Sequence, residues 1–294
     1  MFPLVPYLSG QAHPLGTRLV NVQRCLRFDQ DIDNVGNTNR HTSAFHMIGN
    51  WSLGDYFKEE QLAWVFEYYV EHLGLDIKRL YASVFMGDED APKDEVSIKL
   101  LKNIYKKYGV DAQENERIFA YGKDENWWER GDAVGELGGP DSEVFYYIGD
   151  NGDGFGLNPY DHEDDFLEIG NSVFMQYVRT HDGWKEMEQK NVDYGGGLER
   201  QTMVVQGKSD IFLTDLFYPV IQKLEELTNQ SYTNSWKGMR VIADHMRAAT
   251  LLAMDGVVPS NKELGYILRQ IIRRMIRQGM QLGLTANLSK ALTP

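Results

Sequence analysis

The amino-acid sequence, 294 residues long, predicts an α+β fold followed by a small all-helical segment. Segments with the alternating pattern of β-strands and segments with helical periodicity are interspersed over residues 1–229. After a polar loop, the remaining residues 230–294 show helical periodicity only. An apolar fraction of 42% is enough for a sizeable core. We therefore predict two domains, with a boundary near residue 229.

The strand predictions depend on runs of β-branched and aromatic residues between polar or glycine-rich loops. They cover residues 19–28, 43–52, 79–86, 118–122, 144–148 and 166–179. The long polar loop 29–42 joins the first two strands, and the stretches 135–140 and 151–165 are also predicted as loops. The acidic spacing near residue 151 matches a calcium loop only weakly, because neither the final Glu nor flanking helices are evident.

The helix predictions depend on apolar residues that recur every three or four positions. They cover residues 59–73, 94–108, 198–206, 213–228, 239–254 and 260–283. Gly74 and Gly256 follow two of these segments, and glycine is typical just after the end of a helix. Ser260 and Glu263 form a capping box, which predicts that the last helix starts there.

Composition and charge narrow the class of protein. The single cysteine, Cys25, excludes an intramolecular disulfide and a cysteine-rich zinc site, and no apolar run is long enough to span a bilayer. We therefore predict a soluble cytoplasmic protein without a membrane partner. The net charge of −13 argues against RNA as the main partner, but residues 237–294 carry +6 and the rest −19. A basic helical tail on an acidic body is compatible with local nucleic-acid contact.

The segment 191–200 is the strongest candidate for a binding site. It places three consecutive glycines between Asp193 and the pair Glu199-Arg200. Glycines let a ligand approach the backbone closely, and an arginine in the first turn of the following helix can meet an anion. A tight turn with an ordinary ion pair is the alternative interpretation.

This segment resembles motif 3 of the class II aminoacyl-tRNA synthetases, with the wording found in the alanyl-tRNA synthetase family. Other stretches resemble that family in the same order along the chain. The matching stretches are Arg24–Arg27, Asp31–Gly36, Arg40–His41, Phe45–Phe57, Glu168–Gln176, Asn191–Arg200, Arg240–His245 and Val258–Asn261. The resemblance covers essentially the whole chain. It implies an adenylation domain over residues 1–229, built on a mostly antiparallel sheet flanked by helices, and an incomplete tRNA-recognition segment over 230–294.

The resemblance also implies roles for residues that bind ATP. Arg27 is expected to hold the α-phosphate and the substrate carboxylate, and Arg200 the γ-phosphate. Phe45 is expected to stack on adenine, with Met47 beside it. Asp31 is expected to cooperate with Arg27. Arg40 and Gly197 complete the predicted ATP-binding set. Mg²⁺ is expected with the phosphates, for which Glu143 and Glu168 are candidate ligands, and no zinc is expected.

The same resemblance implies an amino-acid site and an RNA site. Asp193 is expected to pair with the ammonium of L-alanine, and Asn171 and Gly195 to lie beside the amino acid. Val173 and Trp128 are expected to limit the side-chain pocket, although a buried core tryptophan is nearly as good an interpretation of Trp128. The residues expected to contact the acceptor stem of tRNA(Ala) are Arg240, Asn261, Arg269 and Arg273.

Some positions depart from the family pattern. Thr42 and His46 stand where the family has His and Glu, and Gly170 stands where it has Trp. The family loop Gly-Pro-Cys-Gly-Pro-Cys-Ser/Thr-Glu has lost both cysteines here, and the long helix of motif 1 and the editing domain are not represented. We predict ATP-dependent activation of L-alanine and its transfer to the 3′ end of tRNA(Ala). The alternatives are an inactive fragment that binds RNA or a partner, and a ligase with an acceptor other than tRNA.

Overall fold

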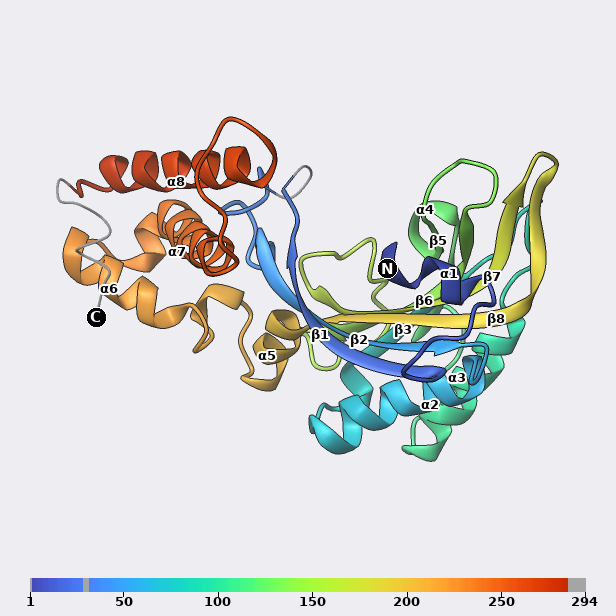
Figure 1. Ribbon diagram of the computed structural model, residues 1–294. Helices are drawn as coiled ribbons and strands as arrows, with labels where there is room; N and C mark the ends of the chain where they lie inside the picture. Colours follow the sequence, from blue (N-terminus) through green and yellow to red (C-terminus); the bar gives the residue numbers. More distant parts are fainter. Residues whose placement is uncertain (1, 29–31, 285–294) are drawn as a thin grey trace. The chain divides into compact units, whose positions relative to one another are not determined.

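The computed structural model describes residues 2–28 and 32–284, and the chain forms two compact units (Figure 1). Unit 1 comprises Met1–Val22 and Met47–Gly197, and unit 2 comprises Gln23–His46 and Leu198–Pro294. The domain boundary predicted near residue 229 falls within unit 2, and it stays a prediction. Within the described residues, no helix combines the length and apolar character needed to cross a membrane.

An eight-stranded sheet is the main element of unit 1, with strand order β1-β2-β8-β7-β6-β3-β4 and β5 paired to β6. The strands are β1 (Arg18–Leu26), β2 (Ala44–Leu53), β3 (Leu80–Phe85), β4 (Ile118–Tyr121), β5 (Trp127–Glu129), β6 (Leu137–Tyr147), β7 (Phe166–Thr180) and β8 (Gly183–Gly197). The β2–β8, β8–β7, β7–β6, β6–β5 and β6–β3 pairs are antiparallel, and the β3–β4 pair is parallel. The predicted mostly antiparallel sheet is confirmed.

Helices of unit 1 flank this sheet. They are α1 (Val5–Leu8), α2 (Lys58–Glu67), which continues as the π-helical η2 (Tyr68–His72), α3 (Glu95–Lys107) and α4 (Lys123–Asn126), with the 3-10 turns η1 (Phe2–Leu4) and η3 (Ile77–Arg79). Figure 1 shows α2 and α3 packed together on one face of the sheet. Asp94 caps α3 by accepting a hydrogen bond from the Ser97 amide, and its other oxygen lies 2.7 Å from Lys58 Nζ.

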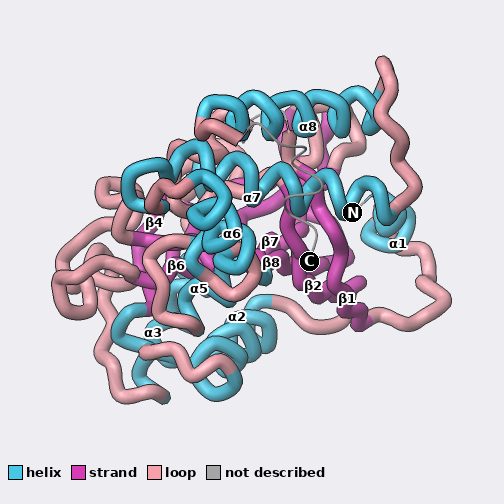
Figure 2. Tube along the Cα trace, turned by 90° about the vertical axis from the view of Figure 1, so that its left-hand side faces the viewer, coloured by secondary structure: helices cyan, strands magenta, loops and turns pink. Residues whose placement is uncertain are grey.

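The helical part of unit 2 contains α5 (Leu198–Val205), η4 (Ile211–Leu213), α6 (Tyr218–Thr228), α7 (Tyr232–Met254) and α8 (Glu263–Gln281). Figure 2 shows α7 and α8 running side by side. Apolar residues from both helices form a core cluster with the start of β2. Its buried members are Ala44, Ala248, Leu252, Leu268 and Ile271. The all-helical character predicted for the end of the chain is thus found in the described part, through residue 284.

Several predicted boundaries were wrong. β6 begins at Leu137, inside the predicted loop 135–140, because the chain pairs there with β5 and, across a bulge, with β7. β8 begins at Gly183, but its first half was not predicted as a strand because that half is mostly polar and exposed. α6 begins at Tyr218, later than the predicted residue 213, and α7 begins at Tyr232, earlier than the predicted residue 239. The last helix begins at Glu263 rather than Ser260.

Candidate active site

The predicted amino-acid-binding residues meet on one face of the sheet in unit 1. Asp193 of β8 is the register partner of Val173 of β7, and Val173 in turn pairs with Asp141 of β6. In the next row, Asn171 pairs with Gly195 and with Glu143. Residues directly opposite each other on antiparallel strands project to the same face. The structure therefore brings these predicted residues together.

Two glycines lie opposite each other in the row next to Asp193. Gly49 of β2 is the register partner of Gly195 of β8. A Cβ on Gly195 would lie 2.8 Å from Met47 Sδ, and a Cβ on Gly49 would lie 2.8 Å from the Tyr194 carbonyl oxygen. Both distances are too short for ordinary contact, and at Gly49, where the neighbour is backbone, the packing requires glycine. The β2 and β8 backbones therefore pack closely in the row next to Asp193.

Burial affects the protonation of Asp193 on this face. Burial raises the pKa of Asp193 to about 6, so the carboxylate form still predominates at neutral pH. Asn171 Nδ2 points at Glu143 Oε1 at 3.5 Å, and Asn171 Oδ1 is buried with no hydrogen-bond partner among the described residues. A carboxylate next to an orphaned amide oxygen is suited to a cationic ligand group such as an ammonium.

Asp141 is a site residue that the sequence did not predict. It stands where the family loop has its second cysteine, and it is 2% exposed. Asn126 Nδ2 donates to its Oδ1 at 3.0 Å. Burial raises the pKa of Asp141 to about 7, although the amides of Asn126 and Asn171 favour its ionised form. The only sequence signal was the unusual acidic residue between Pro140 and Ser142.

Trp128 lies in β5 opposite Gly139 and is partly buried. It packs against an apolar cluster that includes Val173, Leu137 and Met175. Trp128 therefore packs against the apolar cluster to which the predicted pocket residue Val173 belongs. Its contacts fit both interpretations, a pocket wall and a core tryptophan.

The tentative magnesium ligands do not form a protein cage. Glu143 Oε2 accepts a hydrogen bond from the Tyr160 hydroxyl at 2.7 Å, and Glu168 lies on β7. Among the described residues, no group of three or more His, Cys, Asp or Glu side chains could hold a metal ion. This is compatible with Mg²⁺ bound largely by phosphates and water, with one or two carboxylates at most.

The predicted ATP-binding residues divide between the two units. In unit 2, the Arg27 guanidinium lies over the Phe45 ring, 5.3 Å from its centroid, and the Arg27 amide donates to the Ser43 carbonyl oxygen at 2.9 Å. Arg200 lies in the first turn of α5, and Arg40 is partly buried. Met47 and Gly197 are register partners in unit 1. Asp31 lies outside the described residues.

The predicted RNA-binding residues have different surroundings. Arg240 is largely buried: its guanidinium bonds to Asp210 Oδ2 at 2.6 Å, the Tyr232 hydroxyl at 2.7 Å and the Thr38 carbonyl oxygen at 3.0 Å. Arg269 hydrogen-bonds to Asn261 and Arg273 is exposed, so these three residues are accessible on or near α8. Their predicted contacts with tRNA stay predictions.

Two residues that depart from the family pattern, Gly170 and His46, point away from the predicted binding residues. Gly170 is adjacent to Asn171 in β7, so it projects to the opposite face, where a Cβ would meet the Tyr69 and Tyr194 hydroxyls. By the same alternation in β2, His46 projects away from the side that carries Phe45. Neither substitution alters the residues predicted to touch substrate.

A mostly antiparallel sheet flanked by helices, with Asp193 and Asn171 in adjacent rows of one face, is the arrangement expected of a class II synthetase. The chain belongs to the family described as tRNA synthetases class II (A), whose model matches residues 1–294.

The curated relatives that the chain matches are alanine--tRNA ligases. The chain is 42% identical to an alanine--tRNA ligase of Treponema denticola over 98% of its own length and 48% of that protein. It is 41% identical to an alanine--tRNA ligase of Thermotoga maritima over 97% of its length and 32% of that protein. The chain thus spans about half, or a third, of the length of the relatives it matches.

Proposed function

We propose that the chain activates L-alanine with ATP to alanyl-adenylate and transfers alanine to the 3′ end of tRNA(Ala). The observation that carries this proposal is the sheet face of unit 1, where the pairing of β7 with β8 places Asp193, Val173 and Asn171 in adjacent rows beside Gly195. The carboxylate suits an ammonium group, and the restricted apolar contact with Val173 suits a methyl side chain. The similarity to alanine--tRNA ligases supports the same substrate.

In the activation step, a carboxylate oxygen of alanine attacks the α-phosphorus of ATP. A new O–P bond forms, and the bond to the β-phosphate oxygen breaks to release pyrophosphate. Negative charge accumulates on the phosphates, and guanidinium groups stabilise it through charge-assisted, often bidentate hydrogen bonds. Arg27 would act at the α-phosphate and substrate carboxylate, and Arg200 at the γ-phosphate. Mg²⁺ would neutralise phosphate charge, with Glu143 or Glu168 as protein ligands.

Adenine recognition would use Phe45 and Met47. The Phe45 ring already has a cationic partner in Arg27. We infer that the nucleotide uses the same surface, so that adenine stacks on Phe45 while Arg27 turns to the α-phosphate. Arg40 and Gly197 would contact the remaining parts of ATP, and Asp31 would orient Arg27.

Selectivity among small amino acids would be limited. A pocket that accepts a methyl group discriminates by only about 1–3 kcal/mol against an amino acid that differs by one small group. We therefore expect measurable activation of glycine and serine. For the transfer step, Asn261, Arg269 and Arg273 are candidates for contact with the acceptor stem, because the minor groove of an RNA helix is shallow enough for side chains to read.

The proposal is tested by alanine-dependent exchange of labelled pyrophosphate into ATP. Exchange in the wild-type chain that disappears in Arg27→Ala, with Lys237→Met unchanged as a control for loss of one positive charge, would support adenylation. Absence of exchange from folded protein at saturating alanine and ATP would overturn it. Adding tRNA(Ala) then separates a tRNA ligase from an enzyme that uses another acceptor.

A further inference from the structure

One face of α7 is polar although it points into unit 2. Arg240, Asp244 and Arg247 follow each other at intervals of four and three residues, which places them on one side of the helix. We call these three residues the α7 polar stripe. Each of them bonds to the chain between Thr38 and His46 or to a side chain that does so. That segment contains Arg40 and Phe45, two of the residues predicted to bind ATP.

The first two members hold the beginning and middle of this segment. Arg240 Nη1 donates to the Thr38 carbonyl oxygen at 3.0 Å, and Asp210 Oδ2 fixes the same guanidinium at 2.6 Å. Asp244 is 1% exposed and accepts the Ser43 amide at 2.8 Å, and it also accepts the Ser43 hydroxyl. Asp244 Oδ2 also lies 2.8 Å from His245 Nδ1, and a buried carboxylate constrains the backbone it accepts from because losing that bond costs stability.

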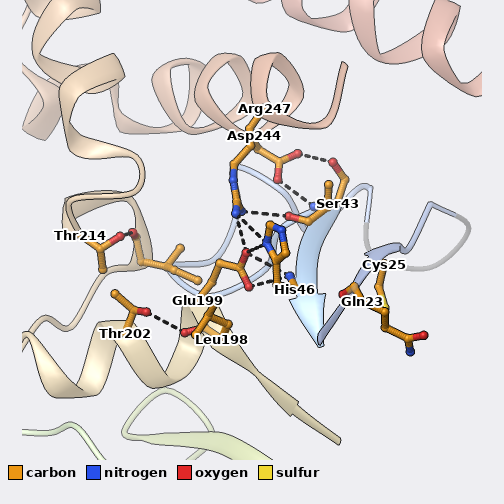
Figure 3. A network of polar contacts seen from close by, with 12 residues as sticks. Gln23, Cys25, Ser43, His46, Leu198, Glu199, Thr202, Thr214, Asp244 and Arg247 are labelled. Atoms are coloured by element: carbon orange, nitrogen blue, oxygen red, sulfur yellow. Dashed lines mark hydrogen bonds and ion pairs between the residues drawn. The ribbon is translucent and has the colours of Figure 1, made fainter. Parts of the chain in front are cut away.

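The third member acts through a carboxylate of α5. Figure 3 shows Arg247 pointing at Glu199 and at the end of the strand that carries His46. Arg247 Nη2 lies 2.6 Å from Glu199 Oε1, and Nη1 donates to the Ala44 carbonyl oxygen at 3.4 Å. Glu199, 1% exposed, accepts the His46 amide at 2.9 Å from Oε2.

The His46 ring is part of the same network. Its Nδ1 lies 3.0 Å from Glu199 Oε1 and 3.1 Å from Arg247 Nη2. Since His46 and Phe45 project to opposite sides of β2, the network contacts the side of the strand away from Phe45. The network thus holds the strand from the side opposite to the Phe45 ring.

We propose that the α7 polar stripe consists of positioning residues for adenylation: it holds the main chain of Thr38–His46, and thereby Arg40 and Phe45, in the shape that binds ATP. This inference rests on the proposed function. A segment ordered before ATP arrives avoids the entropy cost of ordering it on binding, so the stripe would lower the KM for ATP. A helix that the sequence assigned to tRNA recognition would therefore serve the first step of the reaction.

The decisive variant is Arg247→Met, which leaves the carbonyl oxygen of Ala44 without this donor and Glu199 without its guanidinium. We expect the KM for ATP in pyrophosphate exchange to rise about tenfold or more, the range for loss of a hydrogen bond to a charged group. The KM for alanine should stay within about twofold, because Asp193 and Asn171 are not part of this network. Arg247→Lys, which keeps the charge opposite Glu199 but lacks the planar fork, should be intermediate.

The matched control is Lys237→Met, which removes a positive charge from an exposed position on the same helix. It should leave both KM values unchanged. Amide hydrogen exchange supplies a readout that does not require activity: the amides of Ser43 and His46 should exchange faster in Arg247→Met than in the control.

Two results would overturn the inference. One is an equal rise of both KM values in Arg247→Met with a lowered melting temperature, which indicates general destabilisation. The other is unchanged exchange at the Ser43 and His46 amides. If the wild-type chain shows no pyrophosphate exchange, the proposed function fails instead. Positioning is then judged from two measurements that need no activity: amide exchange, and binding of a non-hydrolysable ATP analogue to Arg247→Met and to the control.

Discussion

Replacing Asp141 with Asn should change how the stability of this protein depends on pH. The carboxyl group is almost completely buried between β6 and α4, and burial raises its pKa from the ordinary value of 3.8 to about 7. The folded protein therefore holds the proton over a pH range in which the unfolded chain has released it. Below pH 4 both states are protonated, so this group has no effect on the free energy of unfolding.

As the pH rises from about 4 to about 7, the unfolded state alone ionises, and folding loses stability. Each pH unit between the two pKa values corresponds to 1.36 kcal/mol, so the loss amounts to about 4 kcal/mol above pH 7. Asn cannot ionise, and its amide can still accept from Asn126. Relative to wild type, Asp141→Asn should be close to neutral at pH 4 and more stable by up to about 4 kcal/mol at pH 8.

The assay is urea unfolding of the full chain between pH 4 and pH 8, followed by tryptophan fluorescence and circular dichroism. Taking the difference between wild type and variant cancels the other titrating groups. Glu188→Gln, an exposed carboxyl on the same sheet, should show no such trend. A stability difference that does not vary with pH, or one that turns in favour of wild type at pH 8, would refute the reasoning and show Asp141 stabilised as a carboxylate.

Three further changes follow from the contacts of unit 1. Asp193→Asn should raise the KM for alanine at least about thirtyfold, because it removes the charge opposite the ammonium. The wild-type KM for alanine should also rise as the pH falls through about 6, where the Asp193 carboxylate becomes protonated. Both effects are measured by pyrophosphate exchange. Lys58→Met should cost about 3–5 kcal/mol in urea unfolding because it leaves Asp94 buried without its cation, and an unchanged midpoint would contradict this. Gly170→Ala should cost about 1–3 kcal/mol, since its Cβ meets the Tyr69 hydroxyl, yet leave the KM for alanine unchanged because it lies on the opposite face; a raised KM would show that the two faces are coupled.

Local sequence patterns predicted most of the elements, but failed where tertiary pairing decides. The helix Glu95–Lys107 and the strands β3 and β4 were predicted to within about two residues because their apolar periodicity is strong. The first half of β8 is largely exposed and polar, and it is a strand because it forms a hairpin with the end of β7. No window of sequence contains that information.

The amino-acid site was predicted from motifs, and the sheet register explains why it could be. Asp193, Asn171 and Val173 lie in two stretches that matched family wording, and pairing of β7 with β8 places them in adjacent rows. Asp141 escaped notice because it replaces a residue of the family pattern instead of preserving one. Its importance depends on burial by α4 and β7, which becomes visible only in the structure.

The contacts of α7 show a different limit of sequence interpretation. Arg240 lies in a stretch that resembles the family's tRNA-recognition segment, and it was predicted to contact RNA on that ground. Its actual partners include Thr38, which is 202 positions away, and the Ser43–Asp244 contact spans 201 positions. Among the basic residues of the tail, Arg240 and Arg247 of unit 2 thus bond to the segment that carries Phe45 or to a side chain that does so, while Arg269 and Arg273 are exposed. Charge alone could not separate these groups, because both carry the same guanidinium and only burial and partners differ. If α7 positions the ATP-binding segment, a truncation that removed it would abolish activation as well as RNA contact, whereas removal of the charges at Arg269 and Arg273 would affect transfer only.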